Sequence, residues 1–155
     1  MAGVTVAALT IAGVLSGMGV SMNIPTGWTL LTTTQPLDKR RGTTAVFNPP
    51  RTPAAALMDG LIVESDPAYG RSLMQYVQDT LAGEHHSRLE SRSFKVCSGM
   101  QPGWFVRVRD ASGGPDVEYV FTIDRARGAA AAYSRTSGTV EDPAMHKALA
   151  SLCLK

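Results

Sequence analysis

The sequence is poor in charge, and it lacks the short motifs by which many enzymes are recognised. Charged residues make up 18% of the 155 residues, below the roughly 25% of an average soluble domain. The formal net charge is only +2 at pH 7, which is too small a bias to predict nucleic-acid binding. Neither a G-x-S-x-G elbow nor a glycine-rich loop that opens a helix occurs in the sequence, so the hydrolase and nucleotide-binding patterns are missing. We therefore predict no enzyme activity and no cofactor.

Charge is also missing from the N-terminal stretch, which has no charged side chain between residues 2 and 20. An apolar core followed by small residues is typical of an export signal, although the usual basic start is absent. Two alternatives stay open: a retained membrane anchor, and a buried helix or strand of the domain. Met18 stands where a lipoprotein signal carries its cysteine, which excludes lipid attachment there. We predict an export leader over residues 1–21, a single domain over residues 22–155, and no stable membrane span in the mature chain.

Cysteine is scarce as well, with only Cys97 and Cys153 in the chain. Two lone cysteines without a C-x-x-C pair or a nearby histidine make a poor zinc site. An even number of cysteines behind an export-like leader favours a disulfide. Two buried thiols are the alternative, because cysteine is often buried. We predict a disulfide between these residues and, from it, a secreted, periplasmic or cell-envelope location.

Apolar periodicity and turn residues outline the secondary structure. Pro25 and Gly27 predict a strand end and a tight turn, after which Trp28 covers one side of the core. The predicted strands are residues 29–33, 43–47, 54–64, 93–97, 104–109, 117–123 and 129–136. A helix is predicted over residues 69–81, started by Ser65 or Asp66, and a second over residues 142–152. This order predicts an α+β fold with an antiparallel sheet of about six to seven strands flanked by helices.

The start Ile24-Pro25-x-Gly27-Trp28, the central helix, the sheet after Gly103-Trp104 and the short last helix resemble the Mog/PsbP-like α/β/α sandwich. Among its branches, the chain looks most similar to exported bacterial members such as the LpqN-type envelope lipoproteins and the DcrB-type periplasmic proteins. The resemblance implies binding roles: contact with a small GTPase, support of a photosystem, envelope association, or chaperoning of secreted toxins. It supplies no catalytic residue to carry over.

Three histidines are the candidates for chemistry. His85 and His86 are adjacent, so they point apart on a regular element and do not chelate one metal together. We interpret them as a solvated helix end, with a hydrolase that uses His85 or His86 as the alternative function. His146 is placed near the exposed side of the last helix. Asp116, Glu118 and Asp124 could bind a hard cation, but the pattern favours the solvated face of a strand.

The candidate interaction surface consists of four residues on neighbouring strands: Phe105, Arg107, Arg109 and Arg135. Cross-strand pairing with Glu118 and Asp124 would account for the arginines without any ligand. An exposed Phe105 among them would instead indicate a protein-binding face, because aromatic residues and arginine are enriched at interfaces. That hypothesis requires that the last helix leave this face uncovered. We predict a non-enzymatic exported or envelope protein that binds another macromolecule; a cytosolic chaperone or immunity-type protein is a further alternative.

Overall fold

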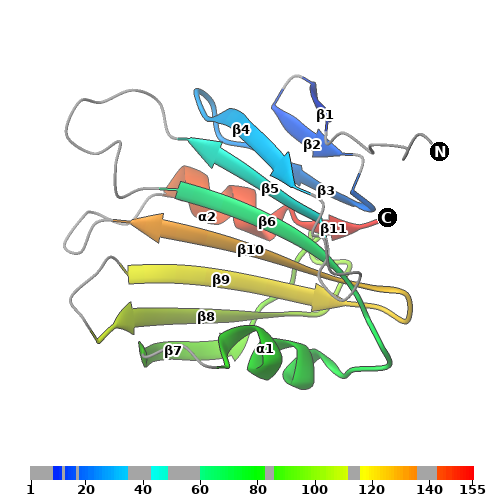
Figure 1. Cartoon of the computed structure of the whole chain (residues 1–155), viewed down its shortest axis with the longest axis vertical. Helices are drawn as coiled ribbons and strands as arrows, with labels where there is room; N and C mark the ends of the chain where they lie inside the picture. The colour runs from blue at the N-terminus through cyan, green and yellow to red at the C-terminus, as the bar shows by residue number, and fades with distance from the viewer. Residues whose placement is uncertain are drawn as a thin grey trace.

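A seven-stranded antiparallel sheet forms the centre of the computed structural model (Figure 1). The structure describes residues 9–11, 13–16, 18–34, 43–48, 60–82, 86–111, 116–135 and 143–155. The strands of the main sheet are β4 (Thr29–Thr34), β5 (Thr43–Asn48), β6 (Gly60–Pro67), β7 (His86–Ser93), β8 (Gly103–Asp110), β9 (Asp116–Ile123) and β10 (Arg127–Arg135). Their order in space is β4-β5-β6-β10-β9-β8-β7. The α+β class and the strand number predicted from the sequence are confirmed.

A second, small sheet joins the two ends of the chain. Its strands are β1 (Leu9–Ile11), β2 (Val14–Ser16), β3 (Val20–Asn23) and β11 (Cys153–Leu154), in the order β1-β2-β3-β11. The side chains of Leu15 and Val20 are fully buried in the larger core cluster. Residues that the sequence assigns to an export leader thus contribute to the core, and processing of that leader stays a prediction.

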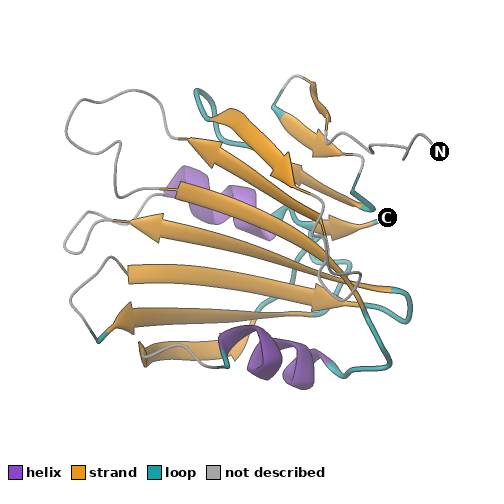
Figure 2. Cartoon of the chain, in the orientation of Figure 1, coloured by secondary structure: helices purple, strands orange, loops and turns teal. Residues whose placement is uncertain are grey.

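Two helices cover opposite faces of the main sheet (Figure 2). Helix α1 (Leu73–Leu81) packs on β8 and β9, and α2 (Pro143–Ala150) belongs to the other core cluster. Side chains alternate between the two clusters along β8: Phe105 lies on the α2 side, and Val106 lies on the α1 side. Because adjacent residues of a strand point to opposite faces, both faces of the central strands are apolar. The molecule is an α/β/α sandwich.

The first helix begins later than predicted. Ser65, Asp66 and Pro67 belong to β6, and the helix starts only after Ser72. The Ser72 side chain accepts a hydrogen bond from the Gln75 backbone, and the Gln75 side chain accepts one from the Ser72 backbone, which forms a capping box. Satisfying both backbone donors stabilises a helix start at this position. The S-x-x-Q spacing was a signal in the sequence that our prediction missed.

The strand predicted over residues 93–97 is also misplaced. Strand β7 ends at Ser93. Beyond it, the Phe94 amide donates to the Gly103 carbonyl, and Val96 forms an isolated bridge with Gln101. His86 begins β7, so the interpretation of this histidine as part of a helix end is wrong. The three strands after Gly103 form the predicted meander, and α2 is present. The predicted positions 54–59, His85 and Asp142 lie outside the described residues.

The two outer strands of the main sheet each contain an irregularity. The register shifts between Leu30 and Thr32 in β4 and between Arg88 and Glu90 in β7. Bulges of this kind disturb the row of unpaired backbone groups at a sheet edge and reduce unwanted pairing with other chains.

Candidate functional site

The disulfide predicted from the sequence is present and links Cys97 to Cys153. Cys97 lies in a tight hairpin in which Cys97, Ser98 and Gly99 all have positive φ angles of 56°, 54° and 81°. The side-chain amide of Gln101 adds a second link, because it accepts a hydrogen bond from the Leu154 backbone and donates one to it. The C-terminal strand is therefore held to the hairpin by a covalent bond and by a two-sided amide contact.

The hypothesis of an aromatic docking face required an exposed Phe105, and Phe105 is buried. Its side chain is 3% exposed, and its ring lies 6.4 Å from the ring of His146 on α2 and 5.8 Å from that of Phe94. The last helix thus covers this face, which is the condition under which the hypothesis of an aromatic docking face fails. The Phe105 ring instead makes a cation–π contact with Arg92, whose guanidinium carbon lies 4.8 Å from the centroid of the ring.

Two arginines of the predicted surface pair with buried carboxylates. Arg107 Nη2 lies 3.1 Å from Glu118 Oε1, which confirms cross-strand pairing with Glu118. Arg109 contacts both oxygens of Asp116, which was not one of the two predicted partners. The contact with Asp116 raises the pKa of the Arg109 guanidinium. Arg135 stands opposite Asp116 in the ladder, and its side chain lies outside the described residues.

The acidic residues differ from the solvated face that the sequence suggested. Glu118 is fully buried and Asp116 is 6% exposed. Asp124 is exposed and accepts hydrogen bonds from the backbone of Ala126 and Arg127, which stabilises the turn between β9 and β10. In the part of the chain that the structure describes, no group of three metal-ligating side chains occurs.

His146 meets a buried carboxylate. His146 Nε2 lies 2.7 Å from Glu118 Oε2, and Arg107 approaches the other oxygen of the same carboxylate. This polar cluster connects α2 to β8 and β9. A buried carboxylate requires hydrogen-bond donors or an opposite charge beside it, because removing a charge from water is costly. We interpret the cluster as a device that positions α2 on the sheet.

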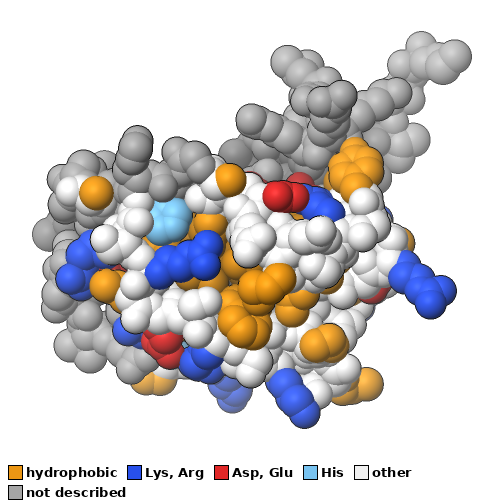
Figure 3. Space-filling model, turned by 90° about the horizontal axis from the view of Figure 1, so that it is seen from below, with side chains coloured by type: hydrophobic (Ala, Val, Ile, Leu, Met, Phe, Trp, Pro, Cys, Tyr) orange, Lys and Arg blue, Asp and Glu red, His pale blue; other side chains and the backbone are white. Residues whose placement is uncertain are grey.

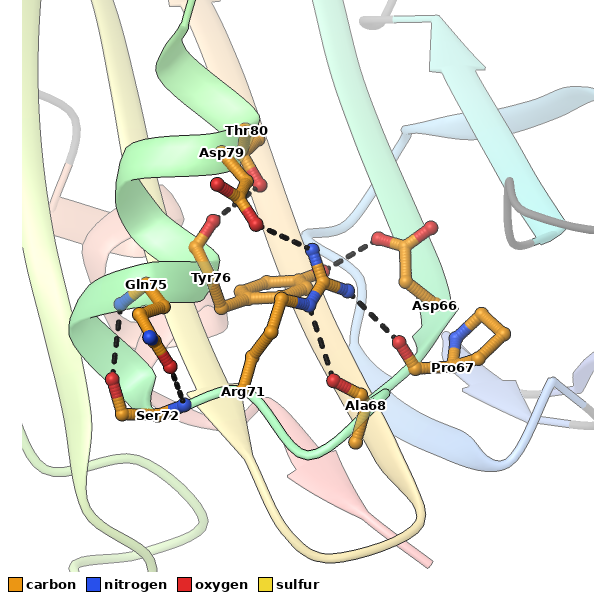
Figure 4. A network of polar contacts seen from close by, with 9 residues as sticks. All are labelled: Asp66, Pro67, Ala68, Arg71, Ser72, Gln75, Tyr76, Asp79 and Thr80. Carbon is orange, nitrogen blue, oxygen red and sulfur yellow. Dashed lines mark hydrogen bonds and ion pairs between the residues drawn. The ribbon is translucent and has the colours of Figure 1, made fainter.

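A second polar network shapes the turn between β6 and α1 (Figure 4). The Arg71 guanidinium donates hydrogen bonds to the backbone carbonyls of Pro67 and Ala68 and pairs with Asp79 at 3.3 Å. Its carbon lies 5.0 Å from the ring centroid of Tyr76 and 5.9 Å from that of Tyr69. Arg71 thereby fixes the turn through charge, hydrogen bonds and both rings.

Tyr69 is the exposed member of this turn. Its side chain is 63% exposed, its φ angle is +51°, and Gly70 after it has a φ angle of +70°. The Arg71 amide donates to the Ala68 carbonyl and closes the turn. Two successive positive φ angles are typical of a type I′ turn, in which glycine and asparagine are the favoured residues. A tyrosine in this position is unusual and strained.

Neither Tyr69 nor Arg71 is among the functional candidates predicted from the sequence. Tyr69 was assigned to the apolar stripe of a helix, because it lies four residues before Leu73. The Tyr-Gly pair directly after a strand was an available signal for a turn.

Tyr76 is the buried member of the network. Its side chain is fully buried, and its hydroxyl donates a hydrogen bond of 2.6 Å to Asp66 Oδ2. Burial, and after it the negative charge and hydrogen bond of Asp66, raise the pKa of the Tyr76 hydroxyl far above its ordinary value. A Cβ atom at Gly128 would lie 2.5 Å from the Tyr76 ring, so only glycine fits beneath it.

Tyr76 is expected to make the folded protein sensitive to alkali. Above about pH 10, Tyr76 of the unfolded chain loses its proton, while Tyr76 of the folded chain keeps it. The contribution of the protonated hydroxyl to the free energy of unfolding is therefore fully present below pH 10 and is lost as the pH rises above it. Tyr76→Phe is expected to unfold more easily by about 1 kcal/mol at pH 8, since it lacks the hydrogen bond to Asp66. The difference in free energy of unfolding between the parent and Tyr76→Phe should decrease by up to about 1.4 kcal/mol per pH unit above pH 10.

Urea titrations of both proteins at pH 8, 10 and 11 would measure this gap. Tyr69→Phe is the matched control, because Tyr69 is exposed. A gap for Tyr76→Phe that stays constant up to pH 11 would contradict the protonated, buried state of the hydroxyl.

No helix among the described residues is long and apolar enough to cross a membrane.

No protein-family model and no curated protein matches the chain. Among solved structures, the chain is similar to cyanobacterial PsbP (CyanoP) of Synechocystis sp. PCC 6803, with a TM-score of 0.59 and 14% identity over 100% of this chain and 98% of that one. It is also similar to a protein of unknown function from Pseudomonas aeruginosa, with a TM-score of 0.50 and 12% identity over 75% of this chain and 98% of that one. Identities this low show a shared fold and no activity. The chain has a PsbP-like fold.

Proposed function

We propose that this protein is a non-enzymatic, exported or cell-envelope protein that binds another macromolecule. The PsbP-like fold supports the proposal, because the roles implied by that resemblance are binding roles. The disulfide supports the location, since such bonds form and persist mainly in oxidising compartments. A specific kinship with LpqN-type or DcrB-type envelope proteins is part of the same proposal.

The strained turn at Tyr69 is the observation that carries the binding role. A non-glycine residue held in the left-handed region costs of order 1–3 kcal/mol, and such strain persists where surrounding contacts enforce it, often at functional sites. Here Arg71 enforces the turn, while the ring of Tyr69 remains 63% exposed. Exposed tyrosines on rigid supports are frequent anchors of protein interfaces. The turn therefore holds Tyr69 in a strained backbone conformation in which its aromatic ring is exposed at the surface.

Replacing Tyr69 separates binding from stability. Asparagine tolerates the left-handed conformation, so Tyr69→Asn relieves backbone strain. This gain offsets the lost contact between the tyrosine ring and Arg71. The free energy of unfolding of Tyr69→Asn is therefore expected to stay within about 1 kcal/mol of the parent. Loss of an aromatic anchor is expected to weaken a complex about 30-fold, as for an interface residue worth about 2 kcal/mol. The two readouts should therefore move independently.

The measurement is the size of the native assembly in cells that produce the protein. Tagged parent and Tyr69→Asn are compared on native gels of the mildly solubilised envelope fraction, alongside urea denaturation of the purified proteins. Ser87→Asn serves as the control, because Ser87 is an exposed residue of the outer strand β7. A parent that migrates only as a single chain would refute the proposed function.

A further inference from the structure

A strip of the molecular surface lies between α1 and the outer strand β7. Partners across the β7–β8 ladder share a face, and Arg88, Ser91 and Ser93 stand opposite Val108, Val106 and Trp104 in that order. Those three residues of β8 belong to or pack against the cluster beneath α1, so the three β7 side chains lie on the α1 side of the sheet. Beyond the end of β7, the Phe94 amide donates to the Gly103 carbonyl and Val96 bridges Gln101, so the backbone stays extended there. Lys95 lies on the α1 side, because its neighbours Phe94 and Val96 both pack in the opposite cluster.

We call these four residues together with Trp104 and Met74 the α1–β7 strip. Its floor is Trp104, which is half-buried and donates a hydrogen bond of 2.8 Å from Nε1 to Ser91 Oγ. The serines beside Trp104 are too small to cover an indole ring, and α1 packs on β8 and β9. Seen from below, hydrophobic side chains gather in the middle of this face with Lys and Arg on both sides of them (Figure 3).

Met74 forms the α1 flank of the strip. Tyr76 reaches Asp66 on β6, and Met74 stands two residues earlier, about 200° away around the helix. Met74 therefore lies on the flank turned away from β6, toward β7, where it is 37% exposed. Trp104 and Met74 offer a large aromatic surface beside an adaptable side chain, and both kinds of residue are common in binding surfaces.

Charge determines the kind of occupant. Arg88 and Lys95 are both exposed and lie at opposite ends of the strip, about 23 Å apart for seven residues of extended chain. The one acidic residue of β7, Glu90, stands opposite Arg107 and thus on the other face, where it pairs with Arg92 and Arg107. A surface that is basic at both ends and apolar in the middle is complementary to an acidic segment with a central apolar side chain.

We propose that the α1–β7 strip binds an extended, acidic segment of a partner protein, with an apolar side chain of that segment seated on Trp104. The proposal rests on the proposed function. It names a second contact surface, in addition to the turn at Tyr69, and the chemistry of the partner segment that this surface binds. The strip is one strand wide and about one strand long, which suits an extended segment better than a broad lipid surface. The bulge in β7 makes side-chain contacts, rather than strand pairing, the main source of affinity.

The test places a photo-crosslinking amino acid, p-benzoylphenylalanine, at Ser93 of the full chain in the cells that produce it. The same amino acid at the exposed Lys147 of α2 is the matched control. Mass spectrometry then identifies the cross-linked peptides. We expect position 93 to capture one segment rich in Asp and Glu with an apolar residue near the cross-link. We also expect Arg88→Glu combined with Lys95→Glu to reduce that capture about tenfold.

Both charge reversals fall on exposed side chains, and circular dichroism verifies that the variant folds. Capture of lipid, of a second copy of this chain or of a basic segment would overturn the proposal. So would capture at position 93 no stronger than at position 147, or capture that ignores the charge reversal. If the native assembly persists on gels in any of these cases, the strip is refuted while the proposed function stands; if no assembly exists, the proposed function itself fails.

Discussion

Removal of residues 1–20 is expected to leave a chain that no longer folds stably. The deletion removes three buried side chains from the larger core cluster, Leu15, Met18 and Val20. Burial of each is worth about 1.5–3 kcal/mol, so roughly 5–9 kcal/mol is lost in total. That amount is comparable with the whole stability of a typical domain, about 5–15 kcal/mol.

The deletion also breaks two polar contacts of the N-terminal segment, one with β10 and one with the C-terminus. The Met18 carbonyl accepts a hydrogen bond of 2.6 Å from Arg127, and the Gly19 carbonyl accepts one of 2.9 Å from the Lys155 backbone. Arg127 packs so closely on Gly19 that a Cβ atom there would lie 2.2 Å from its guanidinium carbon. After the deletion, the half-buried guanidinium of Arg127 would keep only its contact with Ser65 among these bonds.

Urea denaturation followed by circular dichroism compares the full chain with a chain that begins at Ser21. The single substitution Leu15→Ala is the graded control, with an expected loss of about 2–5 kcal/mol. Mass spectrometry of the exported protein then shows whether the predicted leader over residues 1–21 is removed in cells. A protein that begins near residue 21 and is as stable as the full chain would contradict the core role of Leu15 and Val20.

Loss of the disulfide is expected to destabilise the fold by about 4 kcal/mol. Cys97 and Cys153 are 56 residues apart, and cross-linking residues at this separation lowers the entropy of the unfolded chain by about that amount in the chain-entropy model. In the folded state, the bond ties the hairpin around Cys97 to the strand that completes the small sheet. We therefore expect the C-terminal strand to be the first part to loosen.

The double variant Cys97→Ala and Cys153→Ala tests this expectation in urea, with and without a phosphine reductant. Reductant should lower the midpoint of the parent to that of the variant and leave the variant unchanged. Met100→Ala is the control, because Met100 lies in the same hairpin and is 82% exposed, so its effect should stay within about 0.5 kcal/mol. A parent midpoint that does not respond to reductant under denaturing conditions would contradict the bond.

Local sequence patterns predicted the parts of the fold in which a single rule, such as strand alternation or a glycine in a turn, determines the structure. The alternation in residues 104–136 predicted the meander of β8, β9 and β10, and Gly27 indeed takes a positive φ angle of 88° in the turn before Trp28. The even cysteine count predicted the disulfide. In each case the cause is local: backbone geometry at a turn, or the period of two along a strand.

The candidate site was harder, because its residues depend on what covers them. In β9, Glu118 is fully buried while Tyr119 beside it is only half-buried. The alternation along this strand predicts a solvated polar face, as in a sheet with one open face. A helix on each side reverses that inference, since a charged residue can be buried when Arg107 and His146 meet it.

The turn at Tyr69 was predicted wrongly, as part of a helix, for a related reason. Tyr69 and Leu73 fit a helical stripe, and the true helix start lies three residues later, at the Ser72 cap. What holds the turn is Arg71, which contacts Pro67, Tyr76 and Asp79 at once. No local rule places one guanidinium between an aromatic ring and a strand end.

The sequence by itself determined the α+β class, the meander and its alternation, the turn at Gly27 and the cysteine pair, because these follow from dihedral preferences and periodicity within a few residues. Only the tertiary structure decided that Leu15, Met18, Val20 and Met22 help to build the core, that α2 covers Phe105 and that Glu118 is buried. Burial is set by contacts between segments far apart in the chain: 109 residues separate Met18 from Arg127.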